Sequence, residues 1–289
     1  MPGRRPDEMR RDQAGLDERM GPGRRRFLGV AGATTAAGVL GGTAAEPSDQ
    51  ASEARVTGAR RTVLAIGAHY DDCAFGIPGI LLQAVEKGHR VVVLSLIGDY
   101  DNWKPVRGRG PKLVEGTRKV AAEYGVDSRF LGFASGRLTV TEESMRAVAE
   151  VVAEVRPDVA FILWPRDRHP DHEAASELSQ VALRLGDRLL PDPFASWRPP
   201  ERIYLYDNGP RHTIDFEPDT FVDVTPQWSG AIAWLGRLMA LTRGEGYVPG
   251  TLDEAQRLKV ALAGYRGSAC GVDYAEAVVA ANAHLQEIL

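Results

Sequence analysis

The chain has 289 residues, of which 44% are hydrophobic and 26% are charged, and its formal net charge is −4. Residues 1–45 hold eight basic and five acidic side chains, which leaves 27 basic and 34 acidic ones in the remainder. This acidic body argues against generic nucleic-acid binding, because such binding depends on clustered Lys and Arg that neutralise phosphates. The length suits one α/β domain with a large core behind a leader.

The first 45 residues have the features of an export signal. Three arginines at 24–26 lead into an uncharged stretch, rich in Ala, Gly and Thr, that runs to Ala45. The segment resembles a twin-arginine leader with cleavage before Glu46, although a basic tail beside a chance Ala/Gly run is the alternative. Gly and Thr make the stretch poorly hydrophobic, so we expect no stable membrane span in the mature form. We therefore predict an exported protein that is extracellular or in the cell envelope.

Strands and helices alternate along the rest of the chain, after a polar segment at 46–60 that we interpret as a flexible linker. Apolar, β-branched runs predict strands over 61–66, 90–96, 129–133, 159–164, 202–206 and 220–224. Helical patterns occupy 79–87, 113–124, 141–157, 171–185, 226–241 and 252–264, with Thr225 as an expected N-cap. The alternation predicts an α/β fold over 61–289, a Rossmann-like three-layer sandwich with a mainly parallel sheet.

Two short segments about a hundred residues apart, 67–72 and 169–172, hold half of the six histidines and three aspartates. Each segment follows a predicted strand, so both lie where a strand ends. In an open α/β sheet ligands bind beyond the carboxyl ends of the strands, and two parallel strands can bring distant segments together there. The pattern therefore favours a metal site.

A catalytic zinc ion typically takes three protein ligands and leaves one position for water or substrate. We predict that His69, Asp72 and His172 are these ligands. The neighbouring Asp71 could then take a proton from the metal-bound water, whose pKa the metal lowers towards neutrality.

Two further residues of the second segment have predicted roles. His169 could polarise the substrate carbonyl or protonate the leaving amine, and Asp171 could orient an imidazole through a hydrogen bond. Each residue alone is weak evidence, since single histidines are more often structural. The two segments together, with complementary ligand types, carry the prediction.

The two segments resemble the hallmarks of the PIG-L/LmbE-like zinc-dependent N-deacetylases, which are Ala-His-Pro-Asp-Asp after the first strand and a later His-x-Asp-His. Here they read Ala-His-Tyr-Asp-Asp at 68–72 and His-Pro-Asp-His at 169–172, and the resemblance covers about 61–289. Such enzymes hydrolyse the amide of an N-acetylated amino sugar, often N-acetylglucosamine within a glycoconjugate, and release acetate and a free amine.

The resemblance implies roles that agree with the prediction from the residues themselves. It implies that Zn²⁺ is bound by the histidine–aspartate–histidine set and that Asp71 is the general base. It also implies that His169 stabilises the tetrahedral oxyanion or acts as an acid, with Asp171 tuning it. The expected partner is a small molecule or glycoconjugate that carries an N-acetyl group.

The sequence departs from the family pattern at positions that affect specificity. Tyr70 replaces the usual proline, either as a second oxyanion donor or, as we favour slightly, as packing. Ser135 stands where aspartate is common, and Lys112 stands loosely where arginine is frequent. These changes leave the hydrolytic residues in place and put the sugar specificity in question.

Other candidate residues have weaker support. Tyr100 and Trp103 could stack on a sugar ring, and His212 could line the site from a rim loop. The two cysteines, Cys73 and Cys270, permit at most one disulfide.

Three other functions compete with deacetylation. The first is a zinc amidase that acts on another N-acylated small molecule, such as an antibiotic or lipid conjugate. The second is a non-catalytic binding protein that retains the metal. A receiver-like phosphoacceptor domain is disfavoured, because it would leave His169 and His172 without a role.

Overall fold

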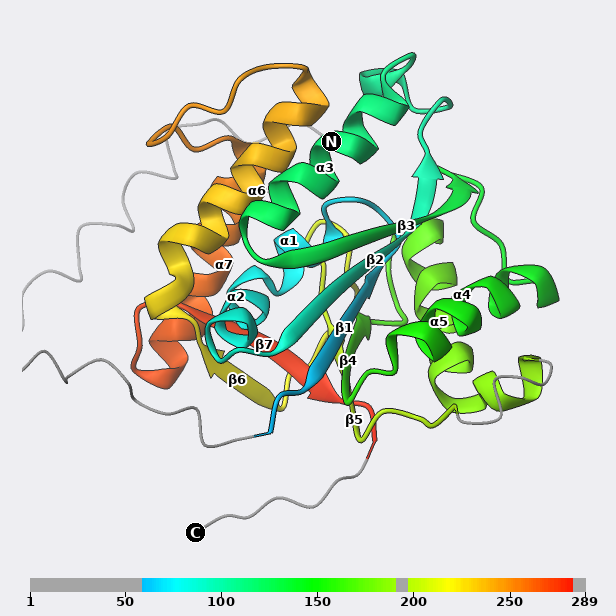
Figure 1. The fold of residues 1–289 in the computed structure, drawn as a ribbon. Coiled ribbons are helices and arrows are strands. Elements are labelled where there is room, and N and C mark those ends of the chain that lie inside the picture. The colour runs from blue at the N-terminus through cyan, green and yellow to red at the C-terminus, as the bar shows by residue number, and fades with distance from the viewer. Residues whose placement is uncertain (1–58, 191–196, 283–289) are drawn as a thin grey trace, which may run out of the picture. The chain divides into compact units, whose positions relative to one another are not determined.

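The computed structural model describes residues 59–190 and 197–282, which build one seven-stranded sheet with helices on both faces (Figure 1). The strands are β1 (Thr62–Gly67), β2 (Arg90–Asp99), β3 (Val126–Ala134), β4 (Val159–Leu163), β5 (Arg202–Tyr206), β6 (Thr220–Asp223) and β7 (Ala275–Ala280). The α-helices are α1 (Asp72–Gly76), α2 (Pro78–Glu86), α3 (Gly110–Glu123), α4 (Glu142–Val155), α5 (Pro170–Leu189), α6 (Trp228–Arg243) and α7 (Glu254–Cys270), with short 3-10 turns at Lys104–Val106 and Thr225–Gln227.

The strand order is β3-β2-β1-β4-β5-β7-β6. All pairings from β3 to β5 are parallel, whereas β7 runs antiparallel to both β5 and β6. The chain leaves β1 in one direction, towards β2 and β3, and returns on the other side as β4. The carboxyl ends of β1 and β4 therefore flank the switch point of the sheet, where open α/β folds bind ligands.

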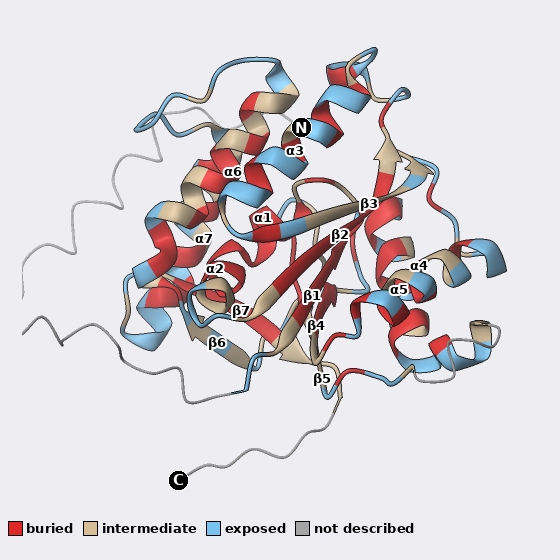
Figure 2. Cartoon of the chain, viewed as in Figure 1, coloured by how far each residue is buried: buried red, intermediate tan, exposed pale blue. Residues whose placement is uncertain are grey.

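The sheet lies between two helical layers. Figure 1 shows α4 and α5 on one face and α1, α2, α3, α6 and α7 on the other. The central strands are almost fully enclosed between these layers, with Leu64, Leu94 and Ile162 all 0% exposed, and the buried residues concentrate along them in Figure 2. Continuous apolar runs of this kind are typical of parallel strands that are covered on both faces.

The predicted fold class is confirmed, and each of the predicted strands and helices is present with modest shifts of its ends. Three local features differ. The five-residue α1 was not predicted, because it is too short to show a helical period. Thr225 belongs to a 3-10 turn, and Gln227 is the residue that precedes α6. The helix from Pro170 continues to Leu189, across a non-helical backbone conformation at Leu185.

The strand β7 was also missed. Its sequence, Ala-Glu-Ala-Val-Val-Ala, has only two β-branched residues, and its pairing with β5 and β6 makes it a strand. The two cysteines do not pair, because Cys73 is a buried free thiol and Cys270 an exposed one.

The predicted leader at 1–45 and nearly all of the predicted linker at 46–60 lie outside the described residues. Within the part of the chain that is described, no helix has the length and apolar character needed to cross a membrane.

Candidate metal centre

The loop after β1 is folded so that His69 and Asp72 face the same space. The Asp72 carboxylate accepts a hydrogen bond from the His69 backbone N–H at 2.8 Å, and Ser95 Oγ of β2 donates to the His69 carbonyl at 3.1 Å. Asp72 is also the first residue of α1, where a carboxylate is favoured by the helix dipole. The turn from strand to helix therefore fixes both side chains.

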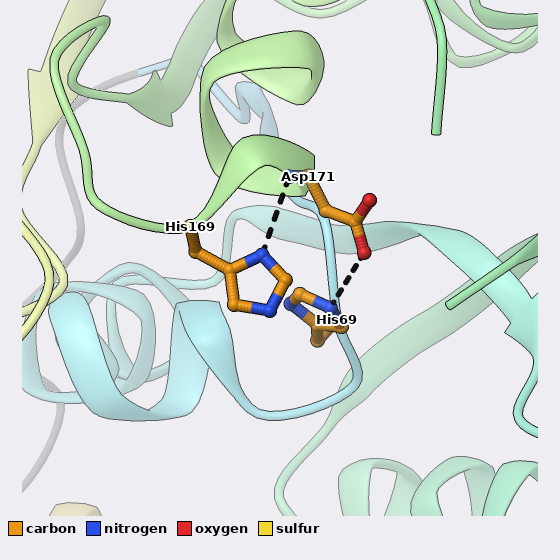
Figure 3. A group of neighbouring side chains, drawn as sticks. All are labelled: His69, His169 and Asp171. Atoms are coloured by element: carbon orange, nitrogen blue, oxygen red, sulfur yellow. Dashed lines mark hydrogen bonds and ion pairs between the residues drawn. The ribbon is translucent and has the colours of Figure 1, made fainter. Parts of the chain in front are cut away.

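The second segment is fixed by the start of α5. His169 is the N-cap, and its Nδ1 accepts a hydrogen bond from the Asp171 backbone N–H at 3.2 Å. Pro170 follows at the first helical position, where its missing N–H is not needed. Figure 3 shows the His169 ring beside the first turn of α5, close to His69 of the other loop. The ring centroids of these two histidines are 4.7 Å apart.

Three donor atoms meet at the centre of the cluster. His69 Nδ1 lies 3.2 Å from His172 Nε2. Asp72 Oδ2 lies 3.6 Å from His69 Nδ1, and Asp72 Oδ1 lies 3.3 Å from His172 Nε2. Ligand atoms of this trio all lie within 4.8 Å of one another. Two imidazole nitrogens and one carboxylate oxygen form the donor set expected for a catalytic zinc with an open position.

Two more carboxylates orient these imidazoles from outside. Asp171 Oδ2 lies 3.2 Å from His69 Nε2, as Figure 3 shows, and Asp167 Oδ1 lies 3.1 Å from His172 Nδ1. Each histidine thus turns one nitrogen to the centre and the other to a carboxylate. This is the arrangement that fixes the tautomer and orientation of metal-ligating histidines.

The same pattern explains why two other groupings in the described residues also resemble metal sites. These are His69 with His169 and Asp171, and Asp167 with His172 and His212. Both groupings rely on the outer carboxylates. Asp171 is already held by the backbone N–H groups of Gly136, at 2.6 Å, and Leu138, at 3.1 Å. We therefore favour the central trio.

The electrostatics of the centre favour a cation. Although burial opposes it, the Asp171 hydrogen bond and the nearby Asp72 raise the pKa of His69 to about 9. Burial likewise opposes protonation of His172, but the charge of Asp72 and the contact with Asp167 raise its pKa to about 10. The carboxylates thus attract positive charge to the two imidazoles, which is the property a site for a divalent ion requires.

Asp71 and His169 lie beside the central trio. Burial, reinforced by the adjacent Asp72 charge, raises the pKa of Asp71 to about 6, in a range suited to proton transfer near neutral pH. Burial and the neighbouring histidines lower the pKa of His169, which favours its neutral form. Because Nδ1 of that ring accepts from Asp171, the proton of neutral His169 resides on Nε2, which is then a donor.

The central trio, Asp71 and His169 all open onto one cavity of about 660 Å³. Its polar lining includes His69, Asp71, Asp72, His169, His172, Ser135, Asn208 and His212. Its aromatic lining consists of Tyr70, Tyr100, Trp103 and Phe75. The cavity is large enough for a small organic ligand, since such sites usually measure about 300–1,000 Å³.

The structure thus brings together all six residues that the sequence singled out. One implied contact is different: the Asp171 carboxylate pairs with His69, whereas its implied target, His169, receives only the Asp171 backbone N–H. The Tyr70 hydroxyl is hydrogen-bonded to Thr242 Oγ1 of α6, so this phenol connects the loop after β1 to α6, in line with the favoured packing interpretation.

Two residues of the site were missed by sequence reasoning. Asp167 Oδ1 lies 3.1 Å from His172 Nδ1, and the Asp167 carboxylate also accepts a hydrogen bond from the His169 backbone N–H at 2.8 Å. Asn208 Nδ2 donates to Asp72 Oδ1 at 2.7 Å. Asn208 carried a usable signal, because it lies just beyond β5, at the same edge of the sheet as the two motif segments.

This fold and site define an α/β protein with a candidate mononuclear metal centre at the switch point of its sheet. Residues 64–183, which include both motif segments, match the family model PIG-L: GlcNAc-PI de-N-acetylase. These residues are therefore similar to the PIG-L family, and the resemblance seen in the sequence is confirmed.

Relatives and solved structures are similar in sequence and fold. A diacetylchitobiose deacetylase of Thermococcus kodakarensis is 29% identical over 131 residues, which are 43% of this chain and 49% of the relative, so the match spans about half of that protein. N,N'-diacetylchitobiose deacetylase from Pyrococcus horikoshii has a TM-score of 0.63 at 18% identity, covering 76% of this chain and 83% of its own. The 4-carboxy-2-hydroxymuconate hydratase from Pseudomonas putida KT2440 has a TM-score of 0.65 at 17% identity, covering 79% and 99%. At these identities the two structures establish the fold alone.

Proposed function

We propose that this protein is a metal-dependent N-deacetylase that removes the acetyl group from an N-acetylglucosamine-like sugar or glycoconjugate. The observation that carries the proposal is the central trio of His69, Asp72 and His172, with Asp71 and His169 beside it in one cavity. The family match and the deacetylase relative support this reaction class. We propose zinc as the metal, because the donor set suits it.

A zinc ion at the trio would supply Lewis-acid polarisation of the amide carbonyl and of water. Asp71 would accept a proton from the water whose oxygen attacks the carbonyl carbon. His169 would donate a hydrogen bond from Nε2 to the oxyanion that forms. As the C–N bond breaks, the proton taken by Asp71 would pass to the leaving nitrogen, so the products are acetate and a free amine. Asp167 and Asp171 would keep the two ligand imidazoles oriented.

We also propose that the protein acts after export, because residues 1–45 resemble a twin-arginine leader. Proteins that use this route fold before they cross the membrane, which suits an enzyme that acquires its metal inside the cell. Detection of the mature chain in the envelope or medium, with a new amino terminus at Glu46, would support export. A chain that stays intact in the cytoplasm would contradict it.

The test of the activity is acetate release from N-acetylglucosamine derivatives, with the metal content measured on the same sample. A chelated sample and a zinc-restored sample are the controls. Release that disappears on chelation and returns with zinc would support the proposal. About one zinc per chain without any release would instead favour an amidase for another acylated amine, and a sample that binds no metal would contradict the catalytic hypothesis.

A further inference from the structure

The cavity has a second part that the deacetylation chemistry does not use. Besides the groups of the metal centre, its lining includes aliphatic side chains of the helical layer, which are Leu235, Met239, Ala255 and Leu258, and Phe75 of α1. We call these five residues the apolar chamber. They come from three helices, α1, α6 and α7, whereas the polar groups of the site come from the loops and the helix start at the strand ends.

The volume of the cavity is larger than the volume of a single sugar. A volume of about 660 Å³ would hold roughly 22 water molecules at about 30 Å³ each. Each water has one non-hydrogen atom, and one N-acetylhexosamine has fewer non-hydrogen atoms than this number of waters. A sugar placed with its acetamide at the metal centre therefore leaves space unfilled. Met239 and Leu258 are only partly buried, so apolar surface remains available in that space.

The rim of the chamber is neutralised rather than charged. Both arginines of the lining are paired: Arg211 with Glu254, and Arg243 with Asp253 at 3.2 Å and with Glu245 at 3.0 Å. A phosphorylated or otherwise anionic substituent there would have to compete with these carboxylates for the arginines.

We propose that the substrate carries a neutral, apolar group of several carbons and that this group binds in the apolar chamber. The inference rests on the proposed deacetylase function and specifies its substrate class. Two sources supply the same chemistry: the acyl chain on the nitrogen, or the aglycone on the anomeric carbon. Burial of each methylene stabilises the bound state enough to raise affinity about three- to fourfold.

The experiment uses two substrate series with the full chain loaded with zinc. One series extends the acyl group of glucosamine from acetyl to butyryl, hexanoyl and octanoyl, and the other extends the aglycone of N-acetylglucosamine from methyl to hexyl and octyl. All are used below their micelle concentrations. We expect kcat/KM to rise at least tenfold along one series, and that series identifies the source of the apolar group.

The variant Ala255→Trp fills the apolar chamber and should reduce the rise of kcat/KM along that series to less than threefold. Ala261→Trp is the matched control, because Ala261 is an exposed alanine of the same helix and does not line the cavity. It should retain the wild-type gain. If the enzyme is active but kcat/KM does not rise along either series, the inference is wrong and the proposed deacetylation still stands.

Binding of octyl β-glucosaminide, measured by calorimetry, separates the two proposals if no turnover is seen. Binding at least tenfold tighter than that of the methyl glycoside, and lost in Ala255→Trp but not in Ala261→Trp, would support the chamber and contradict deacetylation. Equal binding of both glycosides without turnover would overturn both.

Discussion

A buried ion pair at the junction of α1 and α2 leads to a stability prediction that can be worked from the structure. Lys259 of α7 and Glu276 of β7 are 1% and 0% exposed, and their Nζ and Oε1 atoms are 2.8 Å apart. Lys259 also donates to the carbonyl of Gly76, the last residue of α1, at 2.8 Å. The Glu276 carboxylate accepts from the backbone N–H groups of Gly79, at 3.1 Å, and Ile80, at 2.9 Å. The pair thus fastens α7 and β7 to the junction of α1 and α2.

The change in the free energy of unfolding depends on whether one or both charges of this pair are removed. At 2.8 Å and an effective dielectric constant of about 20, the attraction is about 6 kcal/mol, but desolvation costs several kcal/mol for each ion. Burial lowers the pKa of Lys259, and the charge of Glu276 opposes this shift. The intact pair therefore contributes little net stability. Removal of the lysine alone leaves a buried carboxylate without its cation, which typically costs about 3–5 kcal/mol.

We therefore expect Lys259→Met to lower the free energy of unfolding by about 3–5 kcal/mol in urea titrations followed by circular dichroism. Adding Glu276→Gln should recover part of this loss, because it removes the unpaired charge and keeps an amide oxygen for one of the two backbone donors. Lys119→Met is the control, since Lys119 pairs with Glu115 at 3.4 Å with both side chains mostly exposed, and it should cost less than about 1 kcal/mol. A double variant less stable than Lys259→Met would refute the reasoning.

Three predictions concern the metal centre. Asp71→Asn should lower kcat by about 10²–10⁴-fold with zinc retained, because only the proton acceptor is lost; equal loss of zinc would make Asp71 a ligand. His172→Ala should lose zinc in metal analysis of the purified protein, and full occupancy would contradict its ligand role. Asp167→Asn should weaken zinc affinity about 10–100-fold in competition with a chelator, through the orientation of His172; unchanged affinity would show that this contact is dispensable.

The fold could be predicted from the sequence where a single strand or helix carries its own signal. The strands β1, β2 and β4 are continuous apolar runs, and their parallel pairing follows from the helices between them. The strand β7 lacked such a signal. Its alanines favour no particular strand register, and its Glu276 is an acidic residue in a fully buried position. The distant Lys259 on α7 and the backbone N–H groups of Gly79 and Ile80 together make that burial tolerable.

The residues of the candidate site also divide into those that the sequence identified and those that only the folded structure reveals. The candidate donors His69, Asp72 and His172 were recognisable because their types and spacing suit a metal and because each segment follows a strand. Asp167 was not, since an aspartate in a polar loop more often caps or turns the chain. Its role appears only when the loop folds back so that its carboxylate reaches Nδ1 of His172. The Asp171 carboxylate likewise pairs with His69 because of how the two imidazole rings are oriented, and no spacing in the sequence determines that orientation.

The fold alone does not decide the reaction, because a hydratase and deacetylases share it. Both reactions need an activated water, so Asp71 beside a metal is compatible with either. They differ in what happens to the rest of the substrate. A hydratase adds water across a double bond and releases one product, whereas a deacetylase splits its substrate and must protonate a leaving amine. The detection of both acetate and the free amine in equal amounts is therefore the measurement that distinguishes the two reactions. A single product heavier than the substrate by one water would assign this site to hydration instead.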